Sequence, residues 1–186
     1  MFDTCADGRT LKCLTVIDEF TRECLAIDVA GGIRSGRVIE VLTRLVSVHG
    51  APRYLRSDNG PEFVARAVLR WLLDAQIETA FIDPGKLWQN GVDESFNGKF
   101  RHEHLSLQWF RNRIEAAVSI ERWRRHYNEV RPHSSLAYRT PHEFKEIAET
   151  TTRTGRSAAA PPHAEQDEDR TEEPNVLTNP EGAILQ

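Results

Sequence analysis

The sequence predicts an α/β domain in which a mixed β-sheet is flanked by helices. Two early segments rich in β-branched residues lie close enough together to form an antiparallel hairpin. Beyond them, segments with a helical apolar period alternate with short strand-like segments, an order that favours parallel pairing. The chain has 186 residues, enough to bury the core of one domain of ordinary size.

The expected hairpin is formed by residues 10–18 and 24–29, in which Thr, Val, Ile, Leu and Cys predominate. Residues 19–23 are short enough to connect the two strands. Residues 6–9, Ala-Asp-Gly-Arg, supply turn chemistry before the first strand. The residues from Met1 to that turn are therefore expected to be the end of a further strand.

A helix is predicted over residues 35–49, because its apolar residues recur at the spacing of one helix face. Gly50 and Pro52 are expected to end it. The residues 54–58 that follow form a short predicted strand, which ends at an Asn-Gly pair. This segment is thus expected to bring Asp58 to the end of a strand.

The second half of the core is predicted to contain three helices and one strand. Pro61 is expected to open the first of these helices, whose apolar stripe is Phe63, Ala67, Val68, Trp71 and Leu72. A strand is expected over residues 77–82, and a helix from about residue 90 to beyond Arg101. The last helix, over 113–127, has two apolar sides, one with Ile114, Ala117 and Val118 and the other with Ile120, Trp123 and Tyr127.

The chain divides into a core, residues 1–148, and a tail, residues 149–186. The tail is rich in Ala, Pro, Thr and Glu and nearly lacks large apolar residues. A segment of this composition buries too little apolar surface to offset its conformational entropy. We therefore expect the tail to be disordered.

The net charge of −4 is unevenly distributed along the chain. Residues 151–186 hold seven acids and three arginines, so removing them from 28 acids and 24 bases leaves 21 of each. Residues 99–131 hold eight bases against four acids; the bases are Lys99, Arg101, Arg111, Arg113, Arg122, Arg124, Arg125 and Arg131. A local basic surface of this kind favours nucleic acid as a partner, although a solvated helix face has the same composition.

Several classes of protein are disfavoured by composition. No apolar run approaches the roughly 20 residues that a membrane span needs, and the first 25 residues lack a signal peptide's apolar stretch. We therefore expect a cytoplasmic protein with no membrane partner. The cysteines, Cys5, Cys13 and Cys24, are odd in number and form no C-x-x-C pair, so reduced strand cysteines are expected rather than disulfides or a zinc knuckle.

Two acids stand where a fold rarely needs them. Asp58 closes a predicted strand, and ligand sites in open α/β sheets favour that edge. Glu94 lies at a predicted helix start, with Asn97 and Arg101 three and seven residues later on the same face. Taken singly, Asp58 could cap a turn and Glu94 could interact with the helix dipole. Taken together, they suit phosphoryl transfer, in which carboxylates hold two Mg²⁺ ions about 4 Å apart.

Four strings carry a resemblance to a known family. Ser-Asp-Asn-Gly-Pro-Glu-Phe at 57–63 is followed by Glu-Ser-Phe-Asn-Gly at 94–98, with 35 residues between Asp58 and Glu94. The strings at 127–136 and 140–144, together with 15–23, resemble other parts of the same core. Residues 1–147 thus resemble the catalytic core of bacterial insertion-sequence transposases, in the superfamily of DDE transposases and retroviral integrases.

The resemblance implies an RNase H-like fold and a metal-dependent polynucleotidyl transferase. In that reaction water cleaves the end of a DNA element, and the freed 3′ hydroxyl then attacks target DNA. Asp58 and Glu94 would be catalytic metal ligands for Mg²⁺, for which Mn²⁺ would be a substitute. The residues implied to contact DNA are Lys86, Gln89, Asn90, Asn97, Lys99 and Arg101. DNA ends, target DNA and further copies of the chain are the implied partners.

One catalytic acid of the family has no counterpart in this sequence. The alignment of residues 15–23 puts this acid just upstream of Met1, so we expect the first, central strand to be truncated. Asp3 lies too far along the strand, and Asp18 matches a structural turn. The alternative to an active transposase is therefore a non-catalytic remnant that binds DNA or full-length transposase. An unrelated RNase H-like nuclease is disfavoured by the Arg-Pro-His string at 131–133 and by the 35-residue spacing.

The remaining candidate residues are expected to be structural. His102 and His104 are predicted to be a solvated pair on a helix rather than a metal site, and His133 to hold a helix-to-loop junction. The four tryptophans, Trp71, Trp88, Trp109 and Trp123, are mostly core candidates. Trp88, in the loop before Gln89, is the one that could touch a base.

Overall fold

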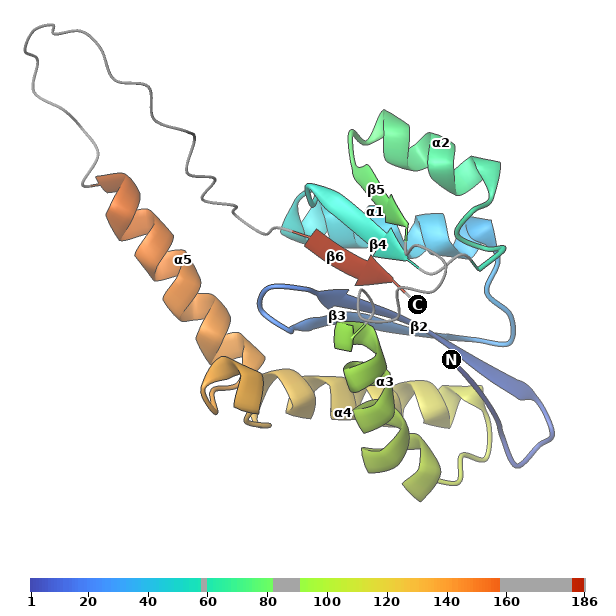
Figure 1. The fold of residues 1–186 in the computed structure, drawn as a ribbon. Coiled ribbons are helices and arrows are strands. Elements are labelled where there is room, and N and C mark those ends of the chain that lie inside the picture. The colour runs from blue at the N-terminus through green and yellow to red at the C-terminus, as the bar shows by residue number, and fades with distance from the viewer. Residues whose placement is uncertain (58–59, 82–90, 158–181, 186) are drawn as a thin grey trace, which may run out of the picture.

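The computed structural model describes residues 1–57, 60–81, 91–157 and 182–185. In these ranges a six-stranded sheet is flanked by helices (Figure 1). Its strands are β1 Phe2–Thr4, β2 Thr10–Asp18, β3 Cys24–Ala30, β4 Tyr54–Ser57, β5 Glu78–Phe81 and β6 Gly182–Leu185. The helices are α1 Ser35–His49, α2 Arg66–Asp74, α3 Gly91–Glu103, α4 Arg113–Glu129 and α5 Pro141–Ser157, with short 3₁₀ turns at Leu105–Leu107 and Ser134–Leu136.

Strand β2 is the centre of the antiparallel half of the sheet. Val16 pairs with Ala26 of β3 and with Leu185 of β6, so β3 and β6 lie on opposite edges of β2. Lys12 likewise pairs with β3 and with Phe2 of β1. β1 and β6 therefore share one edge of β2. On its other side β6 pairs in parallel with β4, which pairs in parallel with β5.

Helices cover both faces of the sheet. Alternate side chains of β2 point to opposite faces, and each face carries apolar side chains that pack against helices. Leu11, Cys13 and Ile17 pack with Phe96 and Phe100 of α3 and with the aromatic side of α4. On the other face, a second cluster is contributed by β2, α1, β4 and α2; its buried members include Leu14, Val16, Val38, Val41, Leu55, Val68 and Leu72. The mixed sheet predicted from the sequence is confirmed, with two helical layers.

The hairpin is confirmed, and its turn is held by Asp18. The Asp18 carboxylate accepts hydrogen bonds from the backbone N–H and the hydroxyl of Thr21, both at 2.6 Å. Arg22 then adopts a left-handed conformation with φ 62°. Asp18 is thus a turn residue, as predicted. Asp3 lies on β1, where its carboxylate accepts from the backbone N–H of Thr4.

Two predicted helices differ in detail from the observed ones. α2 begins at Arg66 and not at Pro61, because Ala65 is extended and the residues before it form turns closed by Gly60. Phe63 is nevertheless buried, as its place in the predicted stripe requires. On α4 the sheet selects the side with Ile120, Trp123 and Tyr127, whereas Ile114 and Val118 are 78% and 60% exposed.

The expected disorder of residues 149–186 is wrong for the parts of the tail that the structure describes. α5 starts with a capping box, in which Thr140 and Glu143 exchange side-chain-to-backbone hydrogen bonds of 2.8 and 3.2 Å, and it runs to Ser157. Phe144 packs edge-on against Phe20, and Lys145 binds Glu23 at 2.8 Å, so α5 is docked on the hairpin turn. Strand β6 adds four further tail residues to the sheet.

The three cysteines are free and buried, in agreement with the prediction of reduced thiols. Burial raises the pKa of Cys13 to about 12 and raises the pKa of Cys24 as well. None of the helices described combines the length and apolarity that a membrane crossing requires.

Candidate active site

Helix α3 carries the candidate residues that the structure describes most fully. Phe96 is 1% exposed and Phe100 is fully buried, and both pack against Trp123 of α4. This anchors one side of α3 and leaves Glu94 exposed on another. Arg101 is also exposed, and Asn97 between them is half-buried. With 3.6 residues per turn, the three lie along one side of the helix, as predicted.

Lys99 lies on a different side of α3 from Glu94. Its ammonium donates to the Ser95 hydroxyl at 3.1 Å. Burial lowers the pKa of Lys99, and the positive charges of Arg131 and Arg22 lower it further. Lys99 therefore belongs to the surface around the end of α4, apart from the row formed by Glu94 and Arg101.

The other predicted site residues lie outside the described ranges. They are Asp58, the candidate second metal ligand, and Lys86, Gln89 and Asn90 of the predicted entry loop, together with Trp88. In the sequence Asp58 directly follows Ser57, the last residue of β4. Within the described ranges no group of three or more His, Cys, Asp or Glu side chains could hold a metal ion.

Asp93 was not singled out in the sequence, yet its side chain is fully buried in the first turn of α3. A carboxylate is favoured at this position by the partial positive charge of the helix N-terminus. Its neighbour Glu94 faces solvent. Two adjacent acids of α3 thus have opposite surroundings, which spacing alone does not distinguish.

The Arg-Pro-His string closes the core by joining the ends of α3 and α4. Arg131, just after α4, binds Glu103 at the end of α3, with 2.9 Å between Nε and Oε2. His133 is 3% exposed and packs edge-on against Tyr127, with ring centroids 4.5 Å apart. Burial, with the nearby charges of Arg131 and Lys99, lowers the pKa of His133 to about 4. These contacts fit the predicted junction role of His133.

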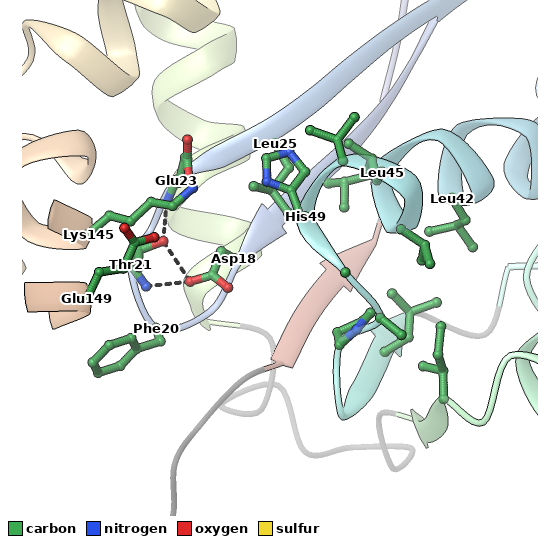
Figure 2. Close-up of a pocket in the computed structure, with 18 of the residues that line it drawn as sticks. Asp18, Phe20, Thr21, Glu23, Leu25, Leu42, Leu45, His49, Lys145 and Glu149 are labelled. Carbon is green, nitrogen blue, oxygen red and sulfur yellow. Dashed lines mark hydrogen bonds and ion pairs between the residues drawn. The ribbon is translucent and has the colours of Figure 1, made fainter. Parts of the chain in front are cut away.

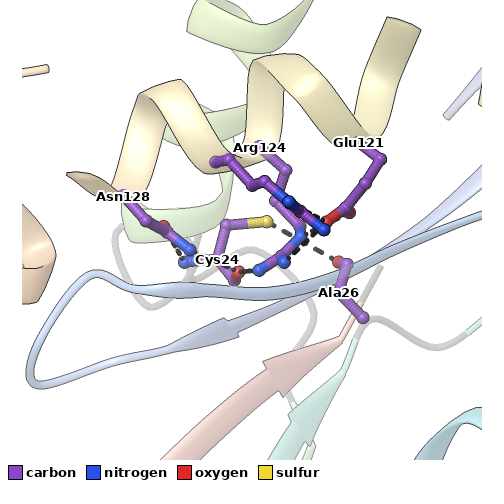
Figure 3. A network of polar contacts seen from close by, with 6 residues as sticks. Cys24, Ala26, Glu121, Arg124 and Asn128 are labelled. Carbon is purple, nitrogen blue, oxygen red and sulfur yellow. Dashed lines mark hydrogen bonds and ion pairs between the residues drawn. The ribbon is translucent and has the colours of Figure 1, made fainter. Parts of the chain in front are cut away.

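A polar network fastens α4 to the start of β3 (Figure 3). The Asn128 side chain accepts from the Cys24 N–H at 2.8 Å and donates to the Cys24 carbonyl at 2.9 Å. Arg124 donates to the same carbonyl at 2.8 Å and forms an ion pair with Glu121. Asn128 belongs to the 127–136 string, so part of that string serves the fold.

Much of the predicted basic surface is engaged within the chain. Arg124 and Arg125 both bind Glu121, and Arg131 binds Glu103. Arg111 lies 3.7 Å from Glu115. Arg113 packs its guanidinium against Gly31, since a Cβ built on that glycine would overlap it. The excess of bases over residues 99–131 therefore overstates the charge available to a DNA phosphate.

Two expectations about aromatic and histidine residues are wrong. His104 is 7% exposed, not solvated, because it lies four residues after the buried Phe100, and its N–H still donates to the Phe100 carbonyl at 3.2 Å. Its ring packs against Phe100, Phe110 and Trp123. Trp109 is 85% exposed and is not a core residue. His102 is exposed, as predicted.

A large cavity among the described residues does not contain the candidate residues of α3. It has a volume of about 670 Å³ and lies between the hairpin turn, α1 and α5 (Figure 2). Leu42 and Leu45 line its apolar side, and Asp18, Glu23 and Lys145 its polar side. No residue of α3 lines this cavity, so it is separate from the candidate residues Glu94, Asn97 and Arg101.

Comparison with protein families confirms the resemblance to transposase and integrase cores. Residues 2–86 and residues 75–141 each match a model described as an integrase core domain. An uncharacterized protein of insertion element IS476 from Xanthomonas euvesicatoria is 46% identical over 144 residues, which are 77% of this chain and 42% of the relative. A protein of IS407 from Burkholderia multivorans is 44% identical over 144 residues, covering 77% and 52%. The putative transposase InsD of element IS2E from Escherichia coli is 29% identical over 154 residues, covering 77% and 69%.

Solved structures are similar at the level of the fold. The integrase catalytic core of HTLV-2, in complex with magnesium, superposes with a TM-score of 0.60 at 17% identity, covering 77% of this chain and 90% of that core. The catalytic core of BIV integrase gives a TM-score of 0.59 at 17% identity, covering 82% and 95%. The predicted RNase H-like fold is therefore confirmed.

The chain spans about half the length of the first two insertion-element relatives. The integrase-core matches together run from residue 2 to residue 141, across the hairpin, α3 and the Arg-Pro-His string. The chain belongs to the integrase core domain family and is a relative of the proteins of bacterial insertion elements.

Proposed function

We propose that this chain is the core of a DNA transposase that catalyses metal-dependent polynucleotidyl transfer, with Asp58 and Glu94 as metal ligands. The observation that carries the proposal is Glu94, an exposed carboxylate on a helix whose opposite side is anchored in the core. Asp58 directly follows the parallel strand β4 within the same family match. Both lie within residues that match an integrase core domain.

The donor chemistry of these residues fits Mg²⁺, which prefers hard oxygen ligands and keeps several waters; Mn²⁺ accepts the same ligands. When bound, one ion would activate the attacking oxygen and the other would stabilise the leaving one. In the proposal Glu94 holds the ion from α3. Arg101, two turns further on, and Asn97 contact the DNA backbone, with Lys86, Gln89 and Asn90 in the entry loop. Lys99 would contact a DNA phosphate from a different side of α3 than Glu94 and Arg101.

The partners in this proposal are the ends of a DNA element, target DNA and other copies of the chain. Transposition requires two ends to be held together, so self-association is part of the proposal. The HTLV-2 core is described in a trimeric and a dimeric form, which supports self-association by family analogy.

The test is Mn²⁺-dependent cleavage and joining of labelled duplex DNA by the 186-residue chain. Glu94→Gln and Asp58→Asn should abolish any activity. Glu129→Gln and Asp74→Asn are matched controls, because both acids are exposed at helix ends outside the proposed site. Equal loss in site and control variants, or activity that survives both site variants, would contradict the proposal.

A second candidate function is favoured by the sequence of β6 and by its place in the sheet. This segment, Gly-Ala-Ile-Leu, lies between β2 and β4, where the resemblance implies the central strand with the first catalytic acid, and it contains no acid. We propose as the alternative a non-catalytic protein that binds DNA or full-length transposase. DNA binding by a folded sample that neither cleaves nor joins DNA would favour it over the first proposal.

A further inference from the structure

Two segments from opposite ends of the chain lie in line along one edge of β2. Met1 faces Cys13, with backbone hydrogen bonds of 2.9 and 3.1 Å between them. Leu185 faces Val16. β1 and β6 both run antiparallel to β2, so they run in the same direction. On β2 the two pairings are three residues apart, or about 10 Å at ~3.4 Å per residue.

β6 is also the strand that joins the two halves of the described sheet. On one side Ala183, Ile184 and Leu185 pair with β2, and on the other the same residues pair with β4. The strand order β1-β2-β6-β4-β5 contains no direct pairing of β2 with β4 among the described residues. Figure 1 shows β6 between these two strands. The antiparallel and parallel halves are therefore connected through four residues.

We propose that Gly182–Leu185 is a built-in donor strand, which fills a strand-accepting site between β2 and β4 in line with β1. The site recognises an extended backbone through hydrogen bonds on both edges, and its occupant is this chain's own C-terminal segment. Ile184 is of a residue type that is enriched in strands, and the segment has no charged residue.

The connection to the rest of the chain permits this pairing. Residues 158–181 number 24, and 24 residues can span up to about 80 Å when fully extended. α5 ends at Ser157 on the same molecule. The entropic cost of closing such a loop rises only slowly with its length, so a strand delivered by a long connection is feasible.

A segment that continued β1 toward its N-terminal side would run along the edge of β2 that β6 occupies. Continuing the β1 register by five residues would place them opposite Leu14 to Asp18. Val16, Ile17 and Asp18 are already paired with β6 on that edge. The two occupants exclude each other, so an upstream strand segment would have to displace β6.

The test is hydrogen exchange of the 186-residue chain, read residue by residue together with thermal unfolding. Amides of Ala183–Leu185 should exchange at least ten-fold more slowly than the same residues in an unstructured peptide. Ile184→Pro, which removes a ladder N–H, should abolish this protection and speed exchange in β4 and β5 at least ten-fold. Ile184→Val is the matched control, and it should leave the protection of Ala183–Leu185 and the exchange rates in β4 and β5 unchanged.

In a second protein, five β-branched residues are added before Met1. The added strand should become protected from exchange, and Ala183–Leu185 should lose protection.

Three results would overturn the proposal. One is peptide-like exchange of Ala183–Leu185 in the unmodified chain, a result that does not depend on whether a variant folds. Another is simultaneous protection of the added strand and β6. The third is protection that arises only at concentrations where the chain dimerises, which would assign the donor strand to a second copy. None of these readouts depends on DNA cleavage, so they are independent of the proposed function.

Discussion

Asn128 binds the backbone of Cys24 with both ends of its side-chain amide, at 2.8 and 2.9 Å, across 104 residues of sequence. The amide imitates a neighbouring strand at the point where β3 begins, and so ties α4 to the sheet. Both residues are buried, so water cannot replace the missing partner if one bond is removed. Asn128 thus serves the fold that supports α3.

Replacing Asn128 with alanine should lower the free energy of unfolding by about 1–3 kcal/mol, because the buried Cys24 N–H would lose its acceptor. Urea unfolding followed by circular dichroism measures the change. Glu129→Ala, at the exposed neighbouring position, should stay within about 0.5 kcal/mol of the unmodified chain. Equal stability of the two variants would show that the network of Figure 3 does not hold α4 to β3.

Phe100→Ala should destabilise the protein by about 3–5 kcal/mol, because the ring is fully buried and its loss leaves a cavity beside Trp123. Trp109→Ala removes a larger ring that is 85% exposed, and should change stability by less than about 0.5 kcal/mol. Thermal or urea unfolding of the pair measures the contrast. A large effect of Trp109→Ala would place that ring in the core after all.

Stability should fall as the pH is lowered from about 6.5 to about 4, partly through His133. The pKa of His133 is lowered from 6.5 to about 4 in the folded state, so in this window the unfolded chain binds a proton that the folded chain does not. Protonation of His133 in the unfolded chain lowers the free energy of unfolding by at most about 3 kcal/mol. This loss is absent above pH 6.5, where the ring is neutral in both states.

His133→Gln removes this titration, and urea unfolding at several pH values between 7 and 4 measures the difference. The buried His104, whose pKa is also lowered by burial, contributes with the same sign in both proteins. The difference between the two proteins therefore isolates His133. Parallel pH profiles would mean that His133 is protonated equally in the folded and unfolded states.

Arg101→Ala should weaken DNA binding and reduce the slope of log K against log salt by about 1, as expected for one lost phosphate contact. Fluorescence anisotropy at several salt concentrations measures the slope. Arg125→Ala is the control: it removes an exposed arginine of α4 whose guanidinium is already paired with Glu121. If both variants lower the slope equally, the row of Glu94 and Arg101 has no special part in binding DNA.

The elements with a strong local pattern were predictable from the sequence. Residues 10–18 and 35–49 form a strand and a helix with the predicted bounds, since their alternation or helical period places apolar side chains on one face. The position of Glu94, Asn97 and Arg101 on one side of α3 was predictable for the same reason. Each of these features depends on residues close together in the chain.

The tertiary structure alone decided which residues the packing would bury or pair. α4 has two apolar sides, and contact with α3 and the sheet selected the one with Trp123. His104 and Trp109 differ in burial because the His104 ring packs against Phe100, Phe110 and Trp123, whereas Trp109 is 85% exposed. The short segment Gly182–Leu185 has no period long enough to predict a strand. It becomes one because β2 and β4 offer hydrogen-bonding edges on both sides, and these edges come together only when the chain folds.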